Sequence, residues 1–276
     1  MLQATIEQSL IFAIMVLGVY ISFRILNFPD MTVDGTFPLG AAISAKLLTL
    51  GVNPYLTLLV ALVAGAAAGA VTGLIHVKLK VKDLLAGILV MTALYSVNLR
   101  VMGKSNIPLF EEDNIFNTEY SMMITIVVLI LISKLLLDYL LKTKFGFALK
   151  ALGDNENLIV SLGLNEEKYK IYGLMIANAF VAFSGAVLAQ YQGFADVGMG
   201  TGIIVIGLAS IIIGDTLFGK RRLAGTTIVI IGSILYRGVI AVTLSMGMDA
   251  SDLKLITSVI VIIILWIQKQ KDKRRK

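Results

Sequence analysis

The pattern that comes closest to a catalytic motif is Gly214–Lys220, which fits the G-x-x-x-x-G-K form of a phosphate-binding loop. Such a loop holds nucleotide phosphates with its backbone N–H groups, and it needs a Ser or Thr after the Lys to bind magnesium. Here Arg221 follows the Lys, and a long apolar run stands where the motif requires a strand. We therefore expect a short cytoplasmic turn in which Gly219 ends a helix and Lys220, Arg221 and Arg222 lie at the lipid headgroups.

A second glycine-rich run, Gly198–Gly202, would suit a dinucleotide only after a strand and within a βαβ unit. The chain has no Cys, which excludes disulfides, thiolate nucleophiles and cysteine zinc sites. Its one His, His76, excludes multi-histidine metal centres. These residues do not assemble a catalytic constellation, and we predict that the chain is not an enzyme.

The composition indicates that membrane-spanning helices position the remaining polar residues. Of the 276 residues, 57% are hydrophobic and 15% are charged, whereas soluble domains are nearer half apolar and a quarter charged. A membrane-spanning helix needs about 20 apolar residues. We predict an all-α, polytopic transmembrane bundle of about nine spans (8–10). The expected segments are 8–26, 37–50, 54–76, 83–102, 121–141, 170–190, 203–218, 224–245 and 252–268.

Two of these segments, 37–50 and 203–218, are short. Each follows a polar, glycine-bearing stretch, at 27–36 and 192–202. Short and interrupted apolar segments are typical of broken helices beside a substrate path. We therefore expect two broken helices in the bundle.

The loop charges predict the orientation of the chain. Nearly all loop Lys and Arg fall on one side of the predicted spans, including the tail Lys269–Lys276. By the positive-inside rule the C-terminus is cytoplasmic, and nine spans place the N-terminus outside. The first residues carry Glu7 but no basic residue, unlike a secretory signal peptide. The basic tail reads as an anchor beside anionic lipid, so we expect a multi-pass protein of the plasma membrane that does not bind nucleic acid.

The third segment carries a stripe of small residues. Gly65, Gly69 and Gly73 recur every four residues with alanines between them. Such a stripe lets another helix approach closely. Packing within the chain is the favoured interpretation, and a contact between subunits is the alternative.

The long cytoplasmic loop at about 142–169 has a structure of its own. A short helix is expected at 145–153, and Asp154 or Asn155 can cap a second helix at 156–162. Leu158, Ile159 and Leu162 share one face of that second helix. Two interpretations remain open on spacing alone: an interfacial helix that seals the bilayer edge, or a docking surface for a soluble partner.

Three segments resemble the permease subunits of ABC importers that serve ribose and branched-chain amino acids. Phe145–Asn165 resembles the A-L-G-x-N-E…G-I-N run of their cytoplasmic coupling loop, Pro29–Thr36 their D-L-S-V-G-S segment, and Ile213–Thr226 their L-G-G…G…G-T turn. The order and spacing agree over nearly the whole chain. Two features are similar to the branch of tryptophan/tyrosine permeases: the sequence P-D-M-T-V-D-G-T-F at Pro29–Phe37, and the sequence L-A-G-I at Leu85–Ile88. Asp34 and Asp215 replace glycines of the ribose type, which indicates another substrate class.

The resemblance implies a single permease domain, residues 1–276, that forms the path for a small solute. The expected solute is an amino acid, with an aromatic amino acid as the candidate. It implies no cofactor in this chain, because ATP is bound by separate cytoplasmic ABC ATPase subunits. The other implied partners are an extracellular substrate-binding protein or lipoprotein, a second permease copy in a homodimer, and the lipid bilayer. The residues expected to couple to the ATPase are Gly153, Asp154, Asn155, Glu156, Leu158, Ile159, Leu162 and Gly163.

Polar residues in or beside apolar segments are candidates to line the path. They are Asp30, Thr32, Asp34, Thr36, Asn98, Asn178 and Gln190. For each of them the alternative is a helix cap or a hydrogen bond between helices. An ion-coupled secondary transporter is the rival function, and it would use intramembrane acids such as Asp138 or Asp215. These acids lie near the predicted ends of membrane spans rather than at mid-membrane, which favours an ATP-driven transporter.

Overall fold

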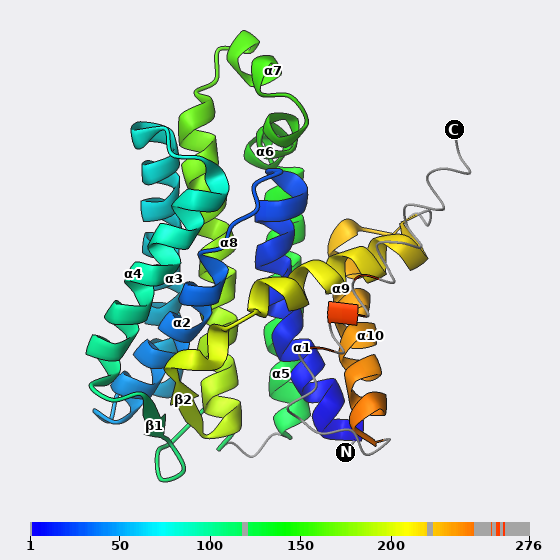
Figure 1. Ribbon diagram of the computed structural model, residues 1–276. Coiled ribbons are helices and arrows are strands. Elements are labelled where there is room, and N and C mark those ends of the chain that lie inside the picture. Colours follow the sequence, from blue (N-terminus) through cyan, green and yellow to red (C-terminus); the bar gives the residue numbers. More distant parts are fainter. Residues whose placement is uncertain are drawn as a thin grey trace.

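The computed structural model describes residues 2–117, 121–219 and 223–245, together with residues 255, 258, 259 and 262. The described chain forms a bundle of long helices that run alternately up and down (Figure 1). In chain order the elements are α1 (Leu2–Val19), the π-helix η1 (Tyr20–Ile25), α2 (Val33–Leu48), α3 (Pro54–Leu79), α4 (Asp83–Met102), β1 (Asn106–Pro108), α5 (Met122–Lys142), α6 (Lys144–Asp154), α7 (Glu156–Ser161), α8 (Glu166–Gln192), β2 (Phe194–Asp196), the 3-10 helix η2 (Val197–Gly200), α9 (Ile203–Phe218) and α10 (Gly225–Ser245).

Seven segments of the described chain are long and apolar enough to cross a membrane. They are Gln3–Ile25, Pro54–Leu79, Asp83–Met102, Met122–Lys142, Glu166–Gln192, Val197–Phe218 and Gly225–Thr243. Each coincides with a predicted span, so the polytopic helical bundle is confirmed. The predicted segment 37–50 falls on α2, which has 16 residues and is shorter than a full span. The segment 252–268 and the tail Lys269–Lys276 lie outside the described residues, so the count of nine stays approximate.

Helix α8 lies at the centre of the bundle and packs against α1, α2 and α3. The small-residue stripe of α3 explains one of these contacts. A Cβ at Gly65, Gly69 or Gly73 would collide with Asn178, Leu174 or Ile171 of α8. The stripe therefore serves packing within the chain, which was the favoured interpretation.

Helices α2 and α9 both begin near mid-height of the bundle (Figure 1). A loop leads from the end of η1 back into the bundle before α2 starts, and η2 leads in from the other end before α9 starts. Their first turns therefore lie inside the protein, as expected for broken helices. Irregular backbone at membrane depth requires such burial, because its N–H and C=O groups find no partners in lipid.

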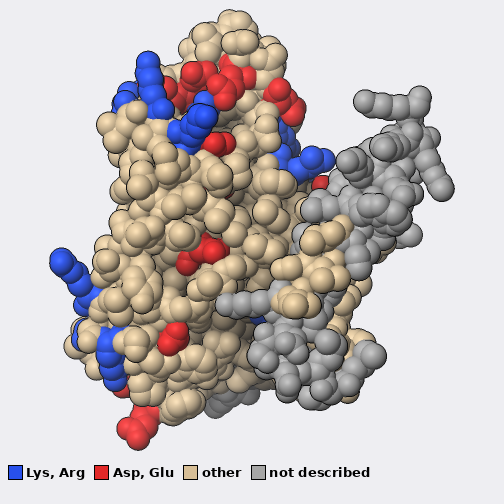
Figure 2. All heavy atoms as spheres, in the orientation of Figure 1, with Lys and Arg blue, Asp and Glu red and all other residues tan. Residues whose placement is uncertain are grey.

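The two ends of the bundle differ in structure. Helices α6 and α7 lie at one end, and the N-terminal end of α1 lies at the other end with β1 and β2 (Figure 1). The strands pair antiparallel, with Asn106 opposite Asp196. Charged side chains gather mainly toward the two ends of the face in Figure 2. The basic loops predicted to be cytoplasmic, which follow α3 and surround α6 and α7, share one end, as a consistent orientation requires.

Candidate functional site

The buried starts of α2 and α9 are joined by one carboxylate. Asp34 lies in the first turn of α2, and its Oδ2 and Oδ1 accept the backbone N–H groups of Gly202 (2.9 Å) and Ile204 (2.8 Å). Gly202 is the N-cap of α9 and has no side chain to accept these bonds. From the sequence, the structural alternative for Asp34 was a cap of its own helix. In the structure it caps α9 instead, because its side chain points away from α2 toward that neighbouring helix end.

Asp30 is fully buried and accepts a backbone hydrogen bond at the start of α2. Its Oδ1 accepts the backbone N–H of Thr32 (2.9 Å), and its Oδ2 accepts Nδ2 of Asn178 in α8 (2.7 Å). The Oδ1 of Asn178 in turn accepts the hydroxyl of Thr36 (2.8 Å). Asn178 of α8 thus holds both Asp30, in the segment before α2, and Thr36 of α2.

Thr32 and Gln190 are also buried and hydrogen-bonded within the chain. The hydroxyls of Thr32 and Thr72 lie 2.7 Å apart. Gln190 donates to the hydroxyls of Ser44 and Thr57, each at 3.0 Å, and accepts the backbone N–H of Ile115 at 3.0 Å. Five of the seven path candidates, Asp30, Thr32, Thr36, Asn178 and Gln190, make hydrogen bonds of this kind and do not line the cavity described next. Their role in a path stays a prediction.

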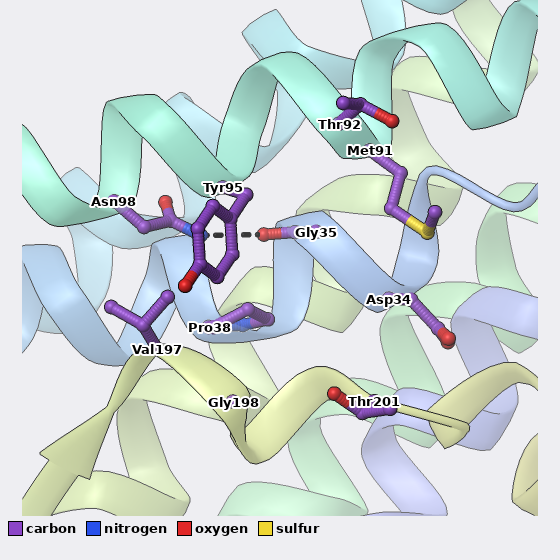
Figure 3. A pocket seen from close by; sticks show the side chains of 10 residues that line it. All are labelled: Asp34, Gly35, Pro38, Met91, Thr92, Tyr95, Asn98, Val197, Gly198 and Thr201. Carbon is purple, nitrogen blue, oxygen red and sulfur yellow. Dashed lines mark hydrogen bonds between the residues drawn. The ribbon is translucent and has the colours of Figure 1, made fainter. Parts of the chain in front are cut away.

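The other two candidates, Asp34 and Asn98, line a cavity of about 350 Å³ beside the start of α2 (Figure 3). Nδ2 of Asn98 donates to the backbone carbonyl of Gly35 at 3.1 Å, and its Oδ1 is buried without a hydrogen-bond partner in the described chain. The walls come from α2, α4, η2 and the start of α9. The lining residues are Asp34, Gly35, Pro38, Met91, Thr92, Tyr95, Asn98, Val197, Gly198 and Thr201.

Sequence reasoning missed most of this cavity, although α4 carries a usable signal. Thr92, Tyr95 and Asn98 recur every three residues in a mostly apolar helix, which places them near one another on its surface. Gly198 and Thr201 belong to the stretch 192–202 that the sequence placed beside a substrate path, but only the fold shows that η2 packs against α2.

The loop predicted to be cytoplasmic forms two helices, as expected, but their caps and burial differ from the expectation. Asp154 ends α6, and Asn155 caps α7 by accepting the backbone N–H of Asn157 at 3.0 Å. Ile159 is fully buried, whereas Leu158 and Leu162 are 46% and 63% exposed. Ile159 therefore packs onto this chain, and the two leucines stay exposed at the end of the bundle.

The remaining coupling candidates hold the two short helices in place. A Cβ at Gly153 would collide with the backbone carbonyl of Ile25, so α6 packs directly on the end of η1. Glu156 pairs with Lys170 of α8 at 2.8 Å. Gly163 follows α7 with a positive φ of 73°, a conformation that favours glycine.

The G-x-x-x-x-G-K match does not have the structure of a phosphate-binding loop. Gly214 lies within α9, where a Cβ would crowd the backbone of Ile228 in α10, and Phe218 ends that helix. A phosphate-binding loop instead precedes a helix and points its N–H groups at the phosphates. The expected turn residues Lys220, Arg221 and Arg222 lie outside the described residues.

The acids considered for ion coupling have partners on this chain. Asp138 pairs with Lys134 and accepts the hydroxyl of Thr226, and Asp215 lies 3.5 Å from Arg24. Within the described residues, no group of three or more His, Asp or Glu could hold a metal ion.

Comparisons with known proteins place this architecture. Residues 1–266 match the family described as "Branched-chain amino acid transport system / permease component". The tyrosine transport system permease protein of Clostridioides difficile (strain R20291) is 50% identical over 263 residues, covering 95% of this chain and 89% of that protein.

Two solved structures share the fold at 15% sequence identity. PsaBC from Streptococcus pneumoniae, solved in complex with Fab, gives a TM-score of 0.58 over 95% of this chain and 90% of that chain. An inward-facing ABC transporter classed as metal-chelate type gives 0.54 over 97% and 84%.

Proposed function

Because the chain belongs to the permease family of branched-chain amino acid transport systems, we propose that it is the path-forming subunit of an ATP-driven importer for an aromatic amino acid. Members of the family are transport permeases rather than enzymes, and the seven apolar helices make this chain a multi-pass membrane protein. The observation that carries the proposal is the pair of half-helices whose first turns meet at Asp34 beside a cavity. Broken helices at membrane depth are the usual setting of a substrate path.

The amino-acid solute is proposed from two independent sources. The relative in Clostridioides difficile is named for tyrosine transport and matches nearly the whole chain. The cavity combines one carboxylate with apolar and aromatic walls, a mixture that suits the ammonium group and the uncharged side chain of an amino acid. In this proposal an extracellular binding protein or lipoprotein delivers the amino acid, and a second permease copy completes the path.

The energy source is proposed to be a cytoplasmic ABC ATPase that docks on α6 and α7. The exposed leucines Leu158 and Leu162 extend from the bundle on a hairpin whose inner side is fixed by Ile159 and Glu156. A rigid support with apolar tips is suited to transmit motion from a soluble partner. This chain then contributes no ATP site of its own, and no cofactor is assigned to it.

Reconstitution tests this function directly. The permease, its ATPase and its binding protein are placed in proteoliposomes, and uptake of radiolabelled L-tyrosine is measured with ATP or a non-hydrolysable analogue on the ATPase side. We expect uptake that requires ATP, requires the binding protein and is unchanged by ionophores. Uptake that needs no ATP and collapses with ionophores would instead identify an ion-coupled secondary transporter.

A further inference from the structure

We propose that the cavity beside Asp34 is a binding site within the permease itself for an aromatic amino acid with a hydrogen-bond donor on its ring. The inference rests on the proposed function and adds a specific solute site to it. In this assignment the ammonium group of the solute lies at Asp34, and the distal end of its ring lies at Asn98. Figure 3 shows these two residues at opposite ends of the cavity, with Pro38 and Tyr95 between them.

Asp34 has the capacity to bind an ammonium group in addition to its structural bonds. A carboxylate offers about four lone-pair sites, and Asp34 uses two of them for the N–H groups of Gly202 and Ile204. Its side chain is partly exposed, whereas Asp30 is fully buried. None of the described residues that line the cavity is Lys, Arg or His. An acidic residue at membrane depth is typical of a substrate or ion pathway, and here a solute can supply the cation that faces Asp34.

The walls between the two ends suit an aromatic ring. Pro38, Met91 and Tyr95 contribute apolar and aromatic surface. Methionine sulfur and tyrosine rings both make favourable contacts with aromatic groups. The volume of about 350 Å³ falls in the range of small-molecule sites, which begins at about 300 Å³.

Asn98 supplies a recognition group for the far end of the ring. Its side chain is fully buried, and its Oδ1 accepts no hydrogen bond in the described chain. A buried acceptor without a donor is costly, and a ring hydroxyl would satisfy it. Met91 lies on the Asp34 side of the cavity (Figure 3), and Asn98 lies seven residues after it on α4, about 10 Å along the helix. The two ends of the cavity can therefore contact different groups of one solute.

The binding test uses the purified permease in nanodiscs, without its partners. Binding is measured by calorimetry for L-tyrosine, L-phenylalanine and 3-(4-hydroxyphenyl)propanoate, which lacks the ammonium group. We expect L-tyrosine to bind at least about tenfold more tightly than L-phenylalanine, because only tyrosine offers a donor to Asn98. We expect no measurable binding of the propanoate. Equal affinity for all three compounds would overturn the assignment of both ends.

Two variants test the site independently of these analogues. Asn98→Leu should lose the preference for L-tyrosine over L-phenylalanine. Thr92→Phe, at an exposed position on the cavity wall, should fill the cavity and abolish binding of both amino acids. Unchanged tyrosine affinity in Thr92→Phe would overturn the proposed location. Since the analogue series uses the unaltered chain, its result does not depend on whether either variant folds.

Uptake in the reconstituted system separates this inference from the function on which it rests. Uptake of L-tyrosine that needs ATP and the binding protein, together with no tyrosine binding to the isolated permease, would overturn the solute site and leave the function standing. Absence of ATP-driven amino-acid uptake would overturn the function itself. Uptake together with selective binding to the isolated permease would support both.

Discussion

The carboxylate of Asp34 accepts the backbone N–H of Ile204 at 2.8 Å, which fixes the start of α2 to the start of α9. At the other end of α9, Asp215 lies 3.5 Å from Arg24 of η1. The segment from η1 to α2 therefore contacts α9 at both ends. Because a partly exposed ion pair is weak, the Asp34 contact is expected to be the stronger of the two.

Asp34→Asn is expected to lower stability, because the carboxamide has one oxygen and cannot accept both N–H groups of α9. One backbone donor would be left unsatisfied at about 1–3 kcal/mol. The apparent melting temperature of the purified protein checks this expectation. Asp113→Asn is the matched control, since Asp113 is an exposed loop residue. Equal melting temperatures for the two variants would contradict the capping role.

Gly69→Ala is expected to destabilise the bundle by separating α3 from α8. The added Cβ would collide with the backbone of Leu174, and overpacking of this kind costs about 1–3 kcal/mol. Gly238→Ala in α10 is the control, because no atom lies within 4 Å of the added Cβ. Thermal unfolding should separate the variants, with Gly238→Ala at or above the unaltered protein. A Gly69→Ala protein as stable as the control would show that the helices are not in close contact.

Asn155→Ala is expected to weaken ATPase docking, because it removes the cap of α7 at about 1 kcal/mol. Asp154→Ala is the control, since Asp154 ends α6 and caps nothing in α7. Co-purification of the ATPase with each variant is the measurement, with membrane expression compared in parallel. Loss of the ATPase in Asp154→Ala but not in Asn155→Ala would reverse the assignment.

The extent to which the sequence predicted this structure depends on the range of the signal. Apolar runs located the helices, and the glycine spacing in α3 predicted close packing, because both signals are local. The sequence did not decide whether Asp154 or Asn155 caps α7. It also placed Ile159 on the face expected to contact the ATPase, whereas that side chain is buried. Only the fold shows that α7 lies against α8, which buries that side chain.

The path candidates show the same limit. A buried polar residue in an apolar segment has the same pattern whether it faces water or another polar group. Asp30 and Asp34 are four residues apart with similar neighbours. Asp30 binds Asn178, which lies 148 positions later in the sequence. Asp34 binds Gly202 at the start of α9, which lies 168 positions later. No local spacing reports contacts of this range.

The orientation of the bundle is predicted by its loop charges and can be tested with cysteines, because the chain contains none. A cysteine at Asp113 should react with an impermeant maleimide in intact cells. A cysteine at Asn157 should react only after the membrane is permeabilised. Both positions are exposed. Asp113 follows β1 and Asn157 lies in α7, and these two elements lie at opposite ends of the bundle (Figure 1). Labelling of Asn157→Cys in intact cells would invert the predicted topology.

Gly153→Ala is expected to separate ATPase docking from transport. The added Cβ would press on the carbonyl of Ile25 and lift α6 from the end of η1, while Leu158 and Leu162 on α7 stay exposed. The ATPase should therefore still co-purify with the permease. Motion passed from α6 to η1, and through the following loop to α2, should be impaired, and ATP-driven uptake should fall by about tenfold, equivalent to ~1.4 kcal/mol. Gly238→Ala should leave both measurements unchanged. If Gly153→Ala loses ATPase binding and uptake together, α6 supports docking rather than the transmission of motion to η1. Normal uptake would show that the contact between α6 and η1 is dispensable.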